Sequence, residues 1–127
     1  MPTRSTLPDA AARLAAVWAS PFFKLNPNFE SSCPVEMNSW QAAPELATQF
    51  WDMAKKVGAK SFVFERGVEV QDDHLALNRA GIPAIDVIDF EGYRKHWHKL
   101  SDLPEQCSGE QIAEVAGATT AWLQLRK

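Results

Sequence analysis

The sequence predicts an α/β domain in which a few, mainly parallel strands are flanked by helices. Helix-type and strand-type segments alternate along the chain, which is the element order of parallel α/β folds. Residues 82–88, IPAIDVI, are apolar at nearly every position, as expected for a strand covered on both faces. The chain has 127 residues, of which 46% are hydrophobic, so it can bury one modest core.

The N-terminal part is expected to hold a short helix and then an irregular segment. Leu14, Val17 and Trp18 have the i, i+3, i+4 spacing of an amphipathic helix, and Pro21 would end it. Residues 20–41 contain three prolines among asparagines and serines, which disfavours a long regular element.

A second helix is predicted from Pro44, which suits a first helical turn, with Glu45 at the positive end of the helix dipole. Gly58 is a suitable C-cap for this helix. One apolar stripe runs along it, formed by Leu46, Phe50, Met53 and Val57.

Two strands and a short helix are predicted next. Residues 61–65 are strand formers, and Gly67 turns the chain. Residues 75–80 form a short helix ended by Gly81, and the buried strand 82–88 follows. Because a parallel sheet buried on both faces usually needs more than two strands, we expect the chain to form part of a larger sheet.

The C-terminal part is expected to be a long loop and a final helix. Loops as long as residues 89–107 are usually functional in compact domains. Ser108 and Gln111 have the spacing of a capping box at the start of the helix. Its apolar face is predicted to comprise Ile112, Val115, Ala116, Thr119 and Leu123.

Composition and charge exclude several classes of function. The net charge is −3 and the basic residues are scattered, so nucleic acid is not an expected partner. No apolar run reaches the roughly 18 residues that span a membrane. Asp9 and Arg13 interrupt the apolar region of any signal peptide, and localisation is left open. Cys33 and Cys107 form either one disulfide or two free thiols, and their spacing is not that of a zinc motif.

An acidic pair and all three histidines surround the predicted buried strand. They are Asp72, Asp73 and His74 before it, and His96 and His98 after it. Ligand-type residues that flank a strand are typical of sites at the edge of an α/β sheet.

Each candidate also has a purely structural interpretation. Asp72 and Asp73 are typical of a helix N-cap, or orient a histidine by hydrogen bonds. His96 and His98 share a metal ion if their segment is extended, or are one buried and one solvated side chain. Asp86 needs a partner inside an apolar strand, so it is a structural anchor or the wall of a pocket.

Two stretches, DDHLALNRAGIPAIDVIDF and WHKLSDLPEQCSGEQIAEV, resemble the C-terminal part of metallopeptidase family 28. That family contains di-zinc aminopeptidases and the related glutaminyl-peptide cyclotransferases. The stretch NSWQAAPELATQFWDMAKKVG resembles the helix that precedes them. The resemblance implies a partial zinc-exopeptidase-like three-layer fold in residues 38–127, preceded by a helix and an irregular segment in residues 1–37.

The resemblance also implies roles for the candidate residues. His98 corresponds to the zinc ligand that closes the family's metal site, and Trp97 to a residue of the substrate pocket. Asp72, Asp73 and His74 correspond to a segment that supports the active site through hydrogen bonds.

Asp86 stands where cyclotransferases usually have a histidine and many bacterial aminopeptidase-like members have an acid. The resemblance therefore places Asp86 in the substrate pocket and favours a peptidase over a cyclotransferase.

The sequence departs from the family in the ligands that the preceding half of the fold supplies. No histidine and no Glu-Glu pair precede His74, and residues 20–28 contain no acid. A zinc site needs at least three protein ligands, and hydrolysis also needs a base. The resemblance therefore implies a truncated zinc aminopeptidase whose intact form cleaves peptides. We expect these 127 residues alone to be inactive, or to need a complementing chain.

Two alternative functions are compatible with the sequence. One is a glutaminyl cyclase-like acyl transferase, which would form pyroglutamate. The other is a non-catalytic module that keeps the helix-and-strand layer as an interaction surface, with a partner chain or a second copy of itself.

Overall fold

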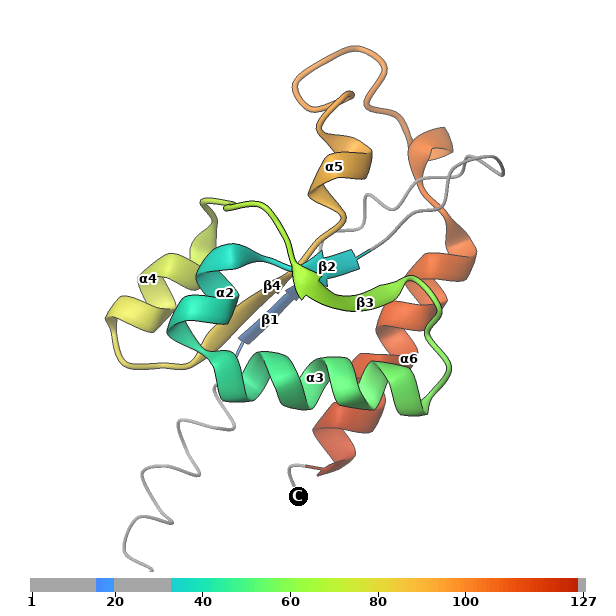
Figure 1. Cartoon of the computed structure of the whole chain (residues 1–127). Helices are drawn as coiled ribbons and strands as arrows, with labels where there is room; N and C mark the ends of the chain where they lie inside the picture. The colour runs from blue at the N-terminus through green and yellow to red at the C-terminus, as the bar shows by residue number, and fades with distance from the viewer. Residues whose placement is uncertain (1–15, 20–32, 126–127) are drawn as a thin grey trace, which may run out of the picture.

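The described residues, 16–19 and 33–125, contain two pairs of parallel strands in the computed structural model. β1 (Ala16–Ala19) pairs with β4 (Ala84–Val87), and β2 (Cys33–Val35) pairs with β3 (Phe62–Arg66). Figure 1 shows the strands at the centre of the molecule with helices around them. The prediction of a few parallel strands flanked by helices is confirmed.

β1 corrects the prediction of a helix at Val17 and Trp18. Both residues belong to a strand, in which Val17 lies opposite Ile85 and Trp18 opposite Asp86 of β4. So short a segment carries helix and strand signals at once, and pairing with a buried strand decides between them. The remaining residues of the predicted helix lie outside the described part of the chain.

The described part of the expected irregular segment, 20–41, is also more regular than predicted. It contains β2 and most of α2 (Met37–Ala42). Pro34 lies inside β2, where the ladder to β3 has an irregularity between Cys33 and Val35. Proline is tolerated at such positions because no ladder hydrogen bond is required of it.

α3 (Pro44–Lys56) begins with Pro44, as predicted. Gly58, two residues after the last residue of α3, has φ 78°, a backbone conformation that favours glycine after a helix end. Leu46 and Phe50 are buried on the predicted stripe. Val57 is 47% exposed, so the buried stripe is shorter than expected.

β3, α4 (Asp73–Arg79) and β4 lie close to the predicted segments 61–65, 75–80 and 82–88. All four residues of β4 are buried, as the apolar run indicated. The loop predicted at 89–107 contains α5 (Phe90–Tyr93) and a 3₁₀ helix, η2 (Pro104–Gln106).

The final helix, α6 (Gly109–Leu125), follows Ser108, whose Oγ accepts the backbone N–H of Gln111 at 3.2 Å. Of the predicted apolar face, Val115 is buried as expected, but Ile112 and Leu123 are exposed. The other buried residues of α6 are Ala118 and Trp122, which the prediction missed. The cause is packing against α3, where Trp122 contacts Phe50 and its Nε1 donates to Gln49 Oε1 at 3.0 Å.

The core lies between α3, α6 and the strands. Phe50 is fully buried, with its ring 5.8 Å from that of Trp51, 6.0 Å from Phe62 and 6.1 Å from Trp122 between centroids. Aromatic pairs at such distances add to the stabilisation that area burial provides.

The structure addresses two further predictions, on the cysteines and on membrane spans, and leaves the domain division untested. Cys33 is buried and Cys107 partly exposed, and both are free thiols, which decides between the two alternatives for the cysteines. No helix among the described residues is long and apolar enough to cross a membrane. The division into residues 1–37 and 38–127 stays a prediction.

The position of Phe50 at the centre of the core predicts how its replacement affects stability. Phe50→Ala should lower the free energy of unfolding by about 3–5 kcal/mol, because a large side chain is removed from a packed interior. Urea unfolding measures this effect. Lys55→Ala, on the exposed side of the same helix, should change the free energy by no more than about 0.5 kcal/mol. Similar losses in both variants would contradict the assigned core.

Candidate functional site

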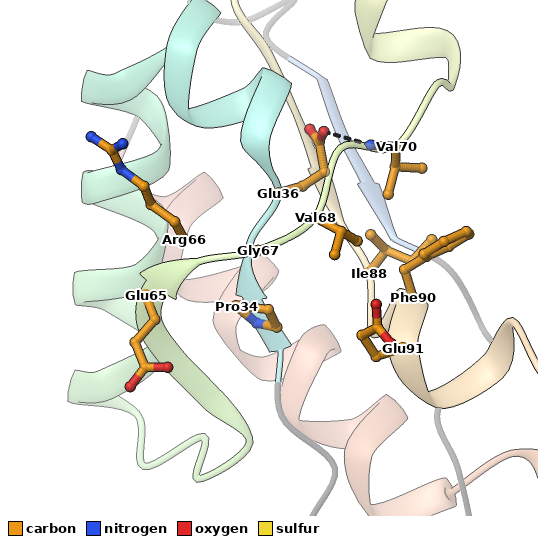
Figure 2. Close-up of a pocket in the computed structure, with 10 residues that line it drawn as sticks. All are labelled: Pro34, Glu36, Glu65, Arg66, Gly67, Val68, Val70, Ile88, Phe90 and Glu91. Atoms are coloured by element: carbon orange, nitrogen blue, oxygen red, sulfur yellow. Dashed lines mark hydrogen bonds between the residues drawn. The ribbon is translucent and has the colours of Figure 1, made fainter.

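A pocket of about 300 Å³ lies beyond the carboxyl ends of β2 and β4. In Figure 2, the side chains of Val68, Ile88 and Phe90 lie near one another, and the Glu36 carboxylate is hydrogen-bonded to Val70. The carboxyl ends of parallel strands are where α/β folds usually bind their ligands. The pocket is therefore the candidate site.

Residues 67–70, which form one wall of the pocket, are held against residues 35–38, which join the end of β2 to the start of α2 and are called the β2–α2 connection below. A side chain at Gly67 would come within 3.0 Å of Pro34 Cγ, so glycine permits this close approach. Four hydrogen bonds join the two segments. With the donor first, they are Gly67 N to Val35 O (2.6 Å), Met37 N to Val68 O (3.1 Å), Val70 N to Glu36 Oε2 (2.9 Å) and Asn38 Nδ2 to Val70 O (3.2 Å).

Glu36 is buried and its carboxylate has five hydrogen-bond partners. They are the backbone N–H groups of Asn38, Ser39 and Val70, the hydroxyl of Ser39, and Nε2 of His74, all at 2.8 or 2.9 Å. Burial raises the pKa of Glu36, but the hydrogen bonds, that of His74 foremost, outweigh burial and leave the pKa below its usual value. The site therefore holds Glu36 as a carboxylate.

His74, on α4, lies between two buried carboxylates. Its Nε2 is 2.8 Å from Glu36 Oε1, and its Nδ1 is 3.9 Å from Asp86 Oδ2. Burial lowers the pKa of His74, but the hydrogen bond to Glu36 and the charges of Glu36 and Asp86 outweigh it, so the pKa is raised. The ring therefore favours the charged form.

Asp86, in the middle of β4, is fully buried. Burial raises the pKa of Asp86 to about 7, and the nearby charge of His74 opposes the rise. The Asp86 carboxylate makes no hydrogen bond to any described residue, while its backbone N–H donates to Ser39 Oγ at 2.8 Å. The charged neighbour of Asp86 is therefore His74, at an ion-pair distance of 3.9 Å without a hydrogen bond.

The acidic pair lies at the start of α4. Asp72 is the N-cap, where its Oδ1 accepts the backbone N–H of Asp73 at 2.8 Å, and Asp73 lies in the first turn. Of the two interpretations of Asp72, the helix N-cap is the one that the structure shows. A supporting role of Asp72, Asp73 and His74 in an active site stays a prediction.

Trp97 and His98 connect to the pocket through Phe90. The ring of Trp97 is 6.2 Å from that of Phe90, in an edge contact, and 4.5 Å from that of His98. Trp97 is half-exposed and His98 is exposed. His98 has φ 58°, in the left-handed region that few non-glycine residues adopt, and such conformations cluster at functional sites.

The idea that His96 and His98 share a metal ion required an extended segment. The structure places both in turns, and His96 Nδ1 is 2.9 Å from Ser101 Oγ. Within residues 16–19 and 33–125, no three His, Cys, Asp or Glu side chains are grouped so as to hold a metal ion. The roles of His98, Trp97 and Asp86 in metal or substrate binding stay predictions.

Glu36 is the site residue that the sequence analysis missed. Its local signal is an acid directly before a helix, with Ser39 in the first turn. Pro34 obscured that signal, because the prolines of residues 20–41 indicated an irregular segment. The bonds of Glu36 to Val70 and His74 join residues 34 and 38 positions apart, which no local pattern reveals.

Comparison with known proteins gives a consistent result. The sequence model of peptidase family M28 matches residues 25–123. A glutaminyl cyclase from Fimbriiglobus ruber is 44% identical, with a TM-score of 0.78 over 89% of this chain and 37% of that one. A leucine aminopeptidase precursor from Bacteroides thetaiotaomicron VPI-5482 is 30% identical, with a TM-score of 0.71 over 86% of this chain and 36% of that one.

A Zn-dependent exopeptidase from Parabacteroides distasonis ATCC 8503 shares the fold, with 24% identity and a TM-score of 0.70 over 88% of this chain and 38% of that one. The chain thus spans 36–38% of the length of these three structures. Among curated proteins, none matches the sequence.

The raised pKa values of Asp86 and His74 predict how stability depends on pH. The folded-state pKa of Asp86, about 7, is above its ordinary value of 3.8, so the folded state binds this proton more tightly. Stability should therefore fall as pH rises from about 4 to 7, by at most roughly 4 kcal/mol at about 1.4 kcal/mol per pKa unit. The raised pKa of His74 acts in the same direction at higher pH.

Urea unfolding at a series of pH values measures this dependence. Asp86→Asn should flatten it, and Asp52→Asn, which changes an exposed acid on α3, should leave it as in the unaltered chain. An unchanged slope in Asp86→Asn would show that Asp86 is not the group responsible.

Proposed function

Because the chain belongs to peptidase family M28, we propose that it provides part of the active site of a zinc-dependent glutaminyl cyclase. The family and the α/β fold of its zinc exopeptidases agree with the resemblance seen in the sequence. Peptides are the substrates that a peptidase family implies. The observation that carries the choice of a cyclase is the 44% identity with the Fimbriiglobus ruber enzyme over 89% of this chain.

The earlier preference for a peptidase depended on Asp86. The Asp86 carboxylate is fully buried and faces His74, so within the described residues it has no open path to a substrate. An acid in this position therefore distinguishes poorly between the two reactions. We place Asp86 beneath the pocket, as a support for His74.

A glutaminyl cyclase joins the N-terminal amine of a glutamine to the side-chain amide carbon of the same residue and releases ammonia. A bound zinc ion would supply a Lewis acid for this reaction, and His98 is the residue of this chain that we expect to contribute to holding it. Phe90 and Trp97 supply an apolar surface beside His98. Once substrate covers it, such a surface would exclude water, which favours attack by the amine over hydrolysis.

His98 does not form a zinc site by itself, because zinc needs at least three protein ligands. We therefore propose that these 127 residues by themselves hold little zinc and are inactive, and that the other ligands come from outside them.

A leucine-type aminopeptidase is the second candidate. The 30% identity with the Bacteroides thetaiotaomicron enzyme, over 86% of this chain, favours it. The same pocket would then hold the first side chain of a peptide, and water rather than the amine would attack.

The zinc role of His98 can be measured in a chimera. Residues 25–123 replace the matching segment of the Fimbriiglobus ruber cyclase, so that the other ligands come from that enzyme. Elemental mass spectrometry should find zinc in the chimera and a clear loss of zinc in His98→Ala. His96→Ala is the matched control, because His96 lies two positions away and contacts Ser101. Equal zinc in all three proteins would remove His98 from the metal site.

The same chimera tests the reaction. It should convert an N-terminal glutamine peptide into the pyroglutamyl peptide with release of ammonia, which mass spectrometry detects. His98→Ala should lower kcat/KM by more than the roughly 10- to 100-fold that loss of a residue supporting a metal ligand costs. Release of leucine without pyroglutamate formation would favour the aminopeptidase, and a folded, zinc-free, inactive chimera would favour a non-catalytic module.

A further inference from the structure

The pocket wall formed by residues 67–70 has no regular secondary structure, so its position depends on its hydrogen bonds. Three of the four bonds to the β2–α2 connection join uncharged amide groups. The fourth, from Val70 N to Glu36 Oε2, has a charged acceptor. Hydrogen bonds to ionised groups are roughly twice as strong as neutral ones.

Glu36 binds the wall and two further elements at once. Its Oε1 accepts from His74 Nε2 on α4 and from the Ser39 hydroxyl on α2. The Ser39 hydroxyl in turn accepts the backbone N–H of Asp86 on β4. One carboxylate therefore fixes the wall relative to the helix that begins with the acidic pair and to the buried strand.

The five donors around Glu36 leave little tolerance for another side chain. A glutamine has the same shape but one oxygen only, and its amide group would point N–H donors at donors of the protein. Leaving buried donors unsatisfied is costly, so glutamine is a sharp test of the carboxylate.

We propose that Glu36 is a positioning residue of the pocket, and that its contact with His74 holds wall 67–70 in place for substrate. The proposal rests on the proposed function only in taking the pocket as the substrate site. The groups that face His74 are Glu36 beside α2 and Asp86 on β4, with the charge of Asp72 at the cap of α4. β1, the other partner of β4, contains no titratable residue in Ala16–Ala19.

Hydrogen exchange of the 127-residue chain tests the wall directly. In Glu36→Gln, exchange of the Val70 amide should accelerate at least about 10-fold more than that of the Ala47 amide, because Val70 loses its bond to the carboxylate whereas the Ala47 amide donates to Ala43 O within the start of α3. Glu69→Gln is the matched control, since Glu69 lies on the same segment with an exposed side chain. Equal acceleration of both amides would indicate a general loss of stability and would overturn the proposal.

Nitrogen NMR of the unaltered chain gives a second test that needs no variant. The His74 ring should carry a proton on both nitrogens at pH 6, with Nε2 donating to Glu36. A neutral ring without a proton on Nε2 would overturn the proposal, whether or not Glu36→Gln folds.

The chimera links the wall to substrate binding. Glu36→Gln should raise KM for the glutamine peptide while zinc content stays the same, and Glu45→Gln, at an exposed acid on α3, should change neither. An unchanged KM would overturn the role in positioning substrate. If the unaltered chimera forms no pyroglutamate, the proposed function fails, and the Val70 and His74 measurements still decide whether Glu36 holds the wall.

Discussion

The contact between Glu36 and His74 is the interaction on which the arrangement of this site depends. Removing a carboxylate and an imidazolium from water costs several kcal/mol per ion, and their attraction alone rarely offsets it. Glu36 tolerates burial because five donors converge on it. The donors come from the start of α2, the pocket wall and α4, so the cost of burying the charge is met only when all three are in place.

The elements that the sequence predicted well are those with a complete local pattern. α3 has a proline at its start, a glycine after its end and a periodic stripe, and β4 is a buried run that only Asp86 interrupts. β1 and β2 were missed because four or three residues carry too little pattern, and their strand character comes from pairing with β4 and β3. The face of α6 was misplaced for a similar reason, since α3 selects Trp122 from several apolar candidates.

In the candidate site, too, local patterns were predicted and long-range contacts were not. The sequence indicated that Asp86 needs a partner and that the histidines and the acidic pair flank one strand. It did not identify His74 as that partner, and it did not indicate Glu36, because these contacts span long stretches of chain. The local pattern had already indicated His98 as a candidate. The resemblance to the family added the predicted roles of His98 as a zinc ligand and of Trp97 as a pocket residue.

The long sequence separation of the Glu36 contacts also affects the order of folding. The bonds to Val70 and His74 close loops of 34 and 38 residues, and loop closure must precede the gain from each bond. Contacts between distant residues form slowly, whereas α3 forms from neighbours. We infer that the pocket takes its final shape only after these two loops have closed and have brought the start of α2, the wall and α4 together.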